Sequence, residues 1–288
     1  MTDPLTIDPI TDPAAARSVL EDLDRAARHW QTPCGDGTMV WRGWGSGPVV
    51  LLMHGGAGSW RHWARNIGVL SREFTVIVPD LPGLGDSANA PEPVDADSIT
   101  AIVSAGLATV IGTEAPVHIA AFSFGGVIAG VLAARLGDRL RSLTLSGSGG
   151  FGPPNRGVAG VRVRGTTGEE RLAAHRENLL RIMLAHPENV DALAMQIQDD
   201  NAHLARLNSG AMWMSRAAAD AMPLVRGHVH GVWGELEMEN REMLDVRIEL
   251  LRAVRPDAEM IVFPNVGHWA FYEAAEEFNA TFLRILKQ

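Results

Sequence analysis

The chain has 288 residues, of which 46% are apolar and 20% charged, values typical of a globular protein with a substantial core. Its 34 acidic and 25 basic residues give a net charge of −9 without a basic run, which argues against nucleic acid as a partner. Because Cys34 is the single cysteine, no internal disulfide is expected. The sequence shows neither a secretory leader nor a stretch of ~20 apolar residues, so we expect a cytoplasmic protein without membrane contact.

Residues 1–30 are expected to form an N-terminal extension whose short amphipathic helix runs from Ala14 to His29. Beyond it, short apolar or β-like runs predict strands, and longer segments of helix formers lie between them. The expected strands are 38–44, 49–53, 74–78, 117–122, 140–146, 228–233 and 259–263, and the expected helices are 98–112, 124–136 and 271–286. This alternation indicates a mostly parallel sheet covered by helices on both faces.

The pattern changes from about residue 149 to residue 225, where two helical segments appear and strands are missing. We therefore expect one α/β core, residues 1–148 and 226–288, interrupted by a helical insertion at 149–225.

The strongest motif is AFSFGG, residues 121–126, at a predicted turn from strand to helix. Such a turn presents the Ser123 hydroxyl above the sheet edge, and small residues two before and two after it, Ala121 and Gly125, relieve the crowding. Ser123 is the expected nucleophile, although an incidental serine in a buried turn is the alternative.

A serine needs a base, and His268 in FPNVGHW follows the last predicted strand, where a loop would bring it to the same sheet edge. The acid that orients this imidazole is sought after strand 228–233. Glu237 is favoured there, Glu235 is second and Asp245 third, while Glu239 lies in the same acidic stretch. An acidic helix start would explain these carboxylates without catalysis.

Negative charge that develops on a substrate carbonyl needs preorganised donors. The backbone N–H groups of Phe124, directly after the nucleophile, and of Gly56, in HGGAGSW, are the expected oxyanion hole.

The motifs HGGAGSW, PDLPGLGDS, AFSFGG, WGELE and VGHW occur in an order that resembles the α/β-hydrolase superfamily. The departures are Ala121 in place of a glycine and Glu237 in place of an aspartate. The resemblance implies that residues 149–225 are a helical cap over the active site. The sequence has no phosphate-binding loop of the GKS or GKT kind and no histidine pair with the spacing of a zinc helix, so we expect neither a cofactor nor a metal.

A serine nucleophile leaves esters, lactones and carbon–carbon bonds beside a ketone as substrates. The segment HGGAGSWRHW is similar to hydrolases that cleave ring-opened aromatic catabolites, whose cap arginines hold a carboxylate; Arg206 or Arg216 would do so here, unless they are surface residues. Further candidates for a substrate pocket are Trp60, His62, Trp213 and Trp269, with Trp63, Met183, Met195, Met212 and Met214 as apolar wall or core.

Two other functions fit the same residues. The scaffold would serve as a ligand receptor with slow or no turnover, because a fold does not fix a function. A cofactor-free perhydrolase would use the same triad to make peracids. The sequence does not reveal the oligomeric state.

Overall fold

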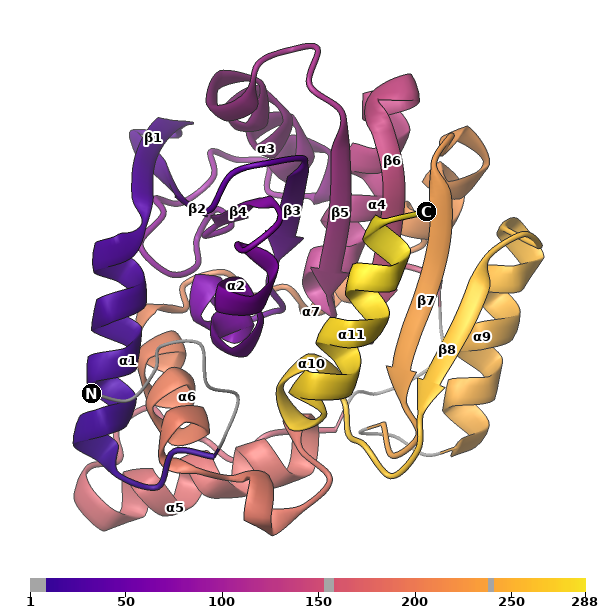
Figure 1. Ribbon diagram of the computed structural model, residues 1–288. Coiled ribbons are helices and arrows are strands. Elements are labelled where there is room, and N and C mark those ends of the chain that lie inside the picture. Colours follow the sequence, from indigo (N-terminus) through magenta and orange to yellow (C-terminus); the bar gives the residue numbers. More distant parts are fainter. Residues whose placement is uncertain (1–8, 153–157, 238–240) are drawn as a thin grey trace.

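The computed structural model describes residues 9–152, 158–237 and 241–288. Its strands form one eight-stranded sheet in the order β1-β2-β4-β3-β5-β6-β7-β8 (Figure 1). Strand β2 pairs antiparallel with both of its neighbours, and the remaining pairs are parallel. The strands are β1 (Arg28–Cys34), β2 (Gly37–Trp44), β3 (Val49–Met53), β4 (Thr75–Pro79), β5 (Val117–Phe122), β6 (Leu140–Ser146), β7 (His228–Gly234) and β8 (Glu259–Phe263). The expected α/β class with a mostly parallel sheet is confirmed.

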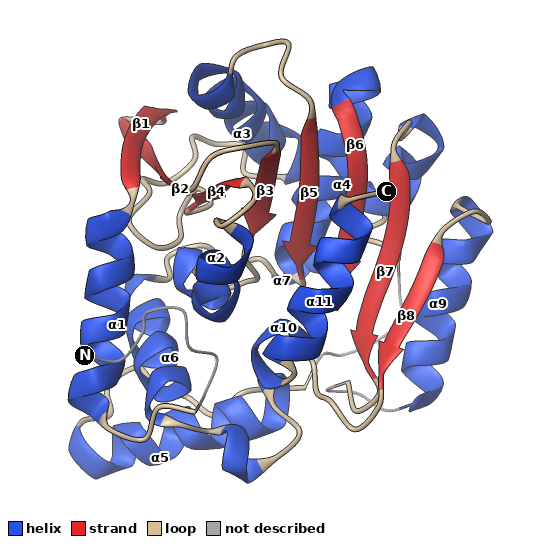
Figure 2. Cartoon of the chain, in the orientation of Figure 1, coloured by secondary structure: helices blue, strands red, loops and turns tan. Residues whose placement is uncertain are grey.

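Helices cover both faces of the sheet (Figure 2). They are α1 (Pro13–Ala26), α2 (Ala64–Leu70), α3 (Ala96–Ile111), α4 (Phe124–Leu136), α5 (Gly168–Asn178), α6 (Ala192–Leu204), α7 (Gly210–Trp213), α8 (Ala217–Ala221), α9 (Arg241–Val254), α10 (Ala270–Glu273) and α11 (Ala275–Leu286). A 3-10 turn, Trp60–Trp63, precedes α2.

Alternate residues of the buried strands serve two separate cores. In β3, Val50 and Leu52 pack with α1, α2, α10 and α11, whereas Leu51 and Met53 pack with α3, α4 and α9. Since successive side chains of a strand point to opposite faces, a continuous apolar run is what a strand covered on both sides requires.

The structure differs from the sequence-based expectation at both ends of the chain. The predicted helix 14–29 ends at Ala26, and the next residues form β1, a strand that the sequence did not predict. Strand β1 pairs with β2 through the turn at Gly35, whose φ is +55°. The predicted helix 271–286 is divided into α10 and α11 at Ala274.

Between β6 and β7, the described residues form helices and turns without a strand. The parallel strands β5, β7 and β8 point toward the sheet edge beside which α5, α6 and α10 lie (Figure 1). Loops that follow the carboxyl ends of parallel strands meet at such an edge, where α/β proteins commonly bind ligands.

Candidate active site

Ser123 lies between the end of β5 and the first residue of α4, with φ +50° and ψ −115°. A non-glycine residue rarely adopts this conformation, so the turn is strained. Close packing holds it: a Cβ on Gly125 would lie 2.4 Å from the His54 carbonyl oxygen, and one on Gly126 would lie 2.0 Å from Ser148 Oγ. The strain and the small residues together give the geometry of a nucleophile elbow.

His268 follows β8 and faces the loop after β7. Its Nδ1 lies 2.6 Å from Glu237 Oε2, and the two residues are only 2% and 6% exposed. The imidazole packs on Gly147, since a Cβ there would lie 2.6 Å from His268 Cε1. A carboxylate that accepts a hydrogen bond from Nδ1 fixes the tautomer in which Nε2 is free to accept a proton.

The other carboxylates considered for this position lie elsewhere. Glu235 Oε2 accepts a hydrogen bond from Asn265 N at 3.1 Å, so it braces the loop after β8. Asp245 is exposed on α9, and Glu239 lies outside the described residues.

Gly56 and Phe124 lie side by side, at the start of the loop after β3 and at the start of α4. A Cβ on Gly56 would lie 3.7 Å from Phe124 Cβ. Both residues line one cavity with Ser123 and His268. The two residues expected to form the oxyanion hole thus lie beside Ser123 in one cavity.

Two buried histidines form hydrogen bonds with Gly55, the residue before Gly56 in this loop. His54 Nδ1 donates to the Gly55 carbonyl oxygen at 2.8 Å, and its Nε2 accepts from Leu81 N at 2.9 Å. His62 Nδ1 accepts from Gly55 N at 3.4 Å. Burial lowers the pKa of His54, and burial together with the nearby His54 and His268 lowers the pKa of His62 well below its ordinary value. Both rings are therefore neutral near pH 7.

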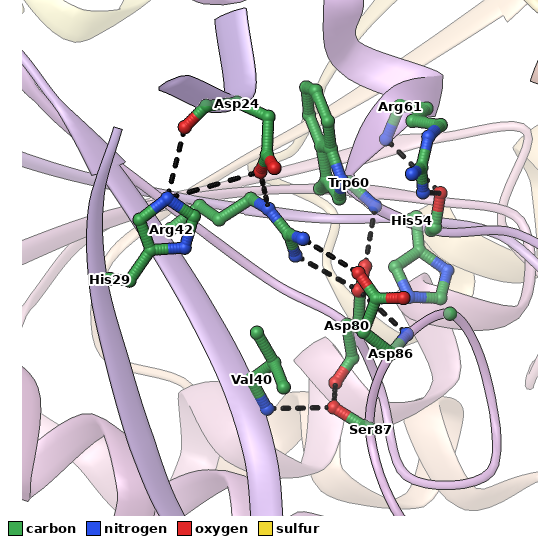
Figure 3. Close-up of polar contacts among 12 residues, drawn as sticks. Asp24, His29, Val40, Arg42, His54, Trp60, Arg61, Asp80, Asp86 and Ser87 are labelled. Carbon is green, nitrogen blue, oxygen red and sulfur yellow. Dashed lines mark hydrogen bonds and ion pairs between the residues drawn. The ribbon is translucent and has the colours of Figure 1, made fainter. Parts of the chain in front are cut away.

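An ion-pair network supports the far end of the same loop (Figure 3). Fully buried Asp80, after β4, accepts from Trp60 N at 2.7 Å through Oδ1. Its Oδ2 lies 3.1 Å from Nη1 of Arg42, whose guanidinium also pairs with Asp24 of α1 and, at 2.6 Å, with Asp86. The network thus joins the N-terminal helix, the sheet and the loop that follows β3.

The cavity above Ser123 has a volume of about 300 Å³. It is lined by core residues Gly56, Phe122, Ser123, Phe124 and His268, and by Ile182, Met183, Ser209, Gly210, Trp213 and Met214 from the helical insertion. The insertion therefore forms one wall of the cavity, and this wall is mainly apolar.

Of the six residues expected to contact a substrate, Trp213 lines this cavity. Trp60 is fully buried beside Trp44, with ring centroids 5.8 Å apart, and Trp269 is stacked on Tyr272 at 4.1 Å. His62 packs beneath the cavity, edge-on to Phe122 at 5.6 Å. These three side chains are at most 3% exposed and are not among the residues that line the cavity, so they belong to the core.

The two arginines expected in the cap also lie outside the cavity. Arg206 donates to the carbonyl oxygens of Leu204, Gly85 and Ser87 and to Asn89 Oδ1. Arg216 is exposed and lies 3.4 Å from Asp220. Both side chains serve contacts within the protein, so neither reaches the place expected from the sequence.

Sequence reasoning missed Ser209, the polar residue of the insertion that lines the cavity. A Cβ on Gly56 would lie 2.6 Å from Ser209 Oγ. No motif surrounds Ser209, and only the folded chain brings it to Gly56.

The alpha/beta hydrolase family model matches residues 49–281, and the chain belongs to this family. Among curated relatives, the 2-hydroxy-6-oxo-6-phenylhexa-2,4-dienoate hydrolase of Comamonas testosteroni is 27% identical over 260 residues, which cover 85% of this chain and 89% of that protein. The chain is accordingly an α/β-fold hydrolase, as the sequence predicted.

Solved structures share the fold. The esterase RhEst1 from Rhodococcus sp. ECU1013 superposes with a TM-score of 0.74 at 19% identity, over 91% of this chain and 99% of that one. The meta-cleavage product hydrolase CumD, as its A129V mutant, gives a TM-score of 0.68 at 21% identity, over 90% and 97%. In the described part of the chain, no helix is both long and apolar enough to span a membrane.

Proposed function

We propose that the protein is a serine hydrolase that cleaves a small carbonyl substrate through an acyl-enzyme on Ser123. The observation that carries this proposal is that Ser123, in its strained turn, and His268, paired with Glu237, line one cavity. Residues 149–225 act as the cap, because the insertion provides the cavity wall opposite the sheet edge.

In the first half-reaction, Ser123 Oγ attacks the carbonyl carbon while its proton passes to His268 Nε2. The π electron pair moves to the carbonyl oxygen, which accepts hydrogen bonds from the N–H groups of Gly56 and Phe124. Glu237 stabilises the imidazolium that forms. The oxyanion then collapses, the leaving group takes the proton from His268, and water releases the acyl group by the same steps.

The test is labelling with a fluorophosphonate, measured by intact mass on wild type, Ser123→Ala and His268→Ala. One adduct on wild type and none on either variant is the expected result. A smaller organophosphate is tested in parallel, because the cap restricts access to the cavity. A folded wild type that reacts with neither reagent would disprove an activated serine and favour the receptor function.

The relatives suggest that the same site could cleave a different substrate bond, a carbon–carbon bond beside a ketone, because the Comamonas testosteroni protein is named for such a substrate. A dienoate carries a carboxylate, whereas Arg206 and Arg216, the residues expected to bind it, are engaged elsewhere. Uncharged esters are therefore the first substrates to assay, with p-nitrophenyl butyrate compared against the phenylhexadienoate at equal concentration. Faster turnover of the dienoate than of the ester would make carbon–carbon bond cleavage the preferred function.

A further inference from the structure

Ser209 brings a hydroxyl group from the helical insertion into the candidate oxyanion hole. The residue lies between α6 and α7, is half-buried, and lines the cavity together with Ser123 and His268. Its Oγ lies on the side of Gly56 where a Cβ would project, 2.6 Å from that position. A cap side chain thus meets a backbone segment that belongs to the loop after β3.

Among the residues that the structure describes, none forms a hydrogen bond with the Ser209 hydroxyl, which carries one donor and two acceptor lone pairs. Ser215, in the same insertion and also half-buried, differs: its Oγ donates to the Met212 carbonyl oxygen at 2.6 Å. The Ser209 donor therefore faces the cavity and is available to a bound molecule.

The backbone around Ser209 is held in place from both sides. The backbone N–H groups of Arg206 and Leu207 donate to the Gly83 carbonyl oxygen at 2.9 and 3.0 Å, and Trp213 N donates to the Ser209 carbonyl oxygen at 2.9 Å. The Arg206 side chain adds contacts to the loop after β4, including the Ser87 carbonyl oxygen. Arg206 thereby anchors the segment that carries Ser209.

We propose that Ser209 is a catalytic residue whose hydroxyl donates a third hydrogen bond to the substrate carbonyl oxygen, beside the N–H groups of Gly56 and Phe124. This role rests on the proposed hydrolase function. A donor that is already oriented costs no reorganisation when charge develops on that oxygen, so it stabilises the transition state more than the ground state. The oxyanion hole is then complete only when the cap segment is in place.

The test compares Ser209→Ala, Ser209→Thr and Ser215→Ala with wild type on p-nitrophenyl butyrate. Loss of the donor in Ser209→Ala should lower kcat by about 10- to 100-fold with KM changed by less than about threefold. Ser209→Thr keeps a hydroxyl and should retain most of the activity. Ser215→Ala loses a hydroxyl bound within the protein, so its melting temperature should fall while kcat stays within about twofold.

A second readout separates a catalytic role from a change in cavity shape. An alkyl trifluoromethyl ketone forms an oxyanion adduct with a reactive serine, so its inhibition constant should rise in Ser209→Ala by the same factor by which kcat/KM falls. Wild-type kcat, or a rise in KM alone, would overturn the role of Ser209. If wild type reacts neither with the ester nor with fluorophosphonate, the proposed function fails as well. If wild type is labelled and Ser209→Ala keeps wild-type kinetics, only the role of Ser209 as third donor is refuted.

Discussion

Glu237 Oε2 lies 2.6 Å from His268 Nδ1, and this pair connects the loop after β7 to the loop after β8. Each side chain lies directly beyond the carboxyl end of its own strand, and the two strands are parallel neighbours in the sheet. The pairing therefore follows from sheet order, since adjacent parallel strands end at the same edge.

Replacing Glu237 by Gln should lower kcat for the ester by about 10³- to 10⁴-fold, because an amide neither stabilises the imidazolium nor fixes its tautomer as a carboxylate does. Glu237→Asp should be less damaging, since the carboxylate is kept with one methylene less of reach. Steady-state kinetics on folded variants measure both effects. Glu235→Gln is the matched control. Equal losses of kcat in the two Gln variants would show that Glu237 is not the acid that orients His268.

Glu273 should act as a positioning residue for the loop that carries His268. Its carboxylate accepts hydrogen bonds from Gly267 N at 2.6 Å, from Ala185 N at 3.0 Å and from Asn189 Nδ2 at 2.8 Å. Glu273→Gln turns one acceptor into a donor that faces these N–H groups, so we expect a loss of about 1–3 kcal/mol in the free energy of unfolding.

The same Glu273→Gln variant should lower kcat at unchanged pH dependence, because it displaces His268 without altering its partner Glu237. Urea unfolding and a pH profile of kcat test the two effects. Glu277→Gln, an exposed change on α11, provides the control. Wild-type stability and kcat in Glu273→Gln would show that the bridge between residues 185–189 and the His268 loop has no effect.

Asp191, at the start of α6, should be essential for holding the insertion to the core. It lies 2.6 Å from Arg65 Nη2 and accepts hydrogen bonds from Tyr272 Oη at 2.5 Å and Ile10 N at 2.9 Å. Asp191→Asn leaves the buried Arg65 without its ion pair, so a loss of about 3–5 kcal/mol in the free energy of unfolding is expected. Urea denaturation measures it.

The control for that variant is Asp138→Asn, because the Asp138 side chain is 83% exposed where it pairs with Arg226, itself 66% exposed. Only a small change in the free energy of unfolding is expected for this pair, because solvent screens exposed charges. Equal effects of the two substitutions would contradict the importance assigned to the buried contact.

Neutral, buried His62 should make the protein less stable in mild acid. Its pKa is lowered in the folded state, so below the unfolded-state value of about 6.5 the unfolded chain binds a proton that the folded chain does not. The contribution of neutral His62 to the free energy of unfolding is therefore fully present above pH ~6.5 and is lost as the pH falls toward the folded-state pKa.

Urea unfolding at pH 7.5, 6.5 and 5.5 measures this dependence in wild type and His62→Gln. The variant should be less stable at pH 7.5 and should lose less stability on acidification, because glutamine does not titrate. Parallel curves for the two proteins would mean that His62 makes no contribution to the pH dependence.

Local pattern was sufficient for much of the fold. Strands 49–53, 117–122, 140–146 and 259–263 and the helix 124–136 have the bounds that the sequence predicted. These elements are buried on both faces or are bordered by glycine and proline, so hydrophobic run length and turn residues specify them without reference to the rest of the chain. Strand β1 was missed because its residues, RHWQTPC, are mostly exposed and acquire their strand conformation by pairing with β2.

The sequence by itself determined the order of Ser123, Glu237 and His268, because each follows an element that its local pattern predicts. Only the tertiary structure decided which carboxylate faces His268, which of the expected pocket residues line the cavity, and that Ser209 meets Gly56. Those relations join segments that are distant along the chain, and sequence spacing does not encode the direction in which a side chain points. Arg206 and Trp60 illustrate the reason: residue type and position along the chain made each a candidate for substrate binding, whereas packing against neighbours on other elements gave each a structural role.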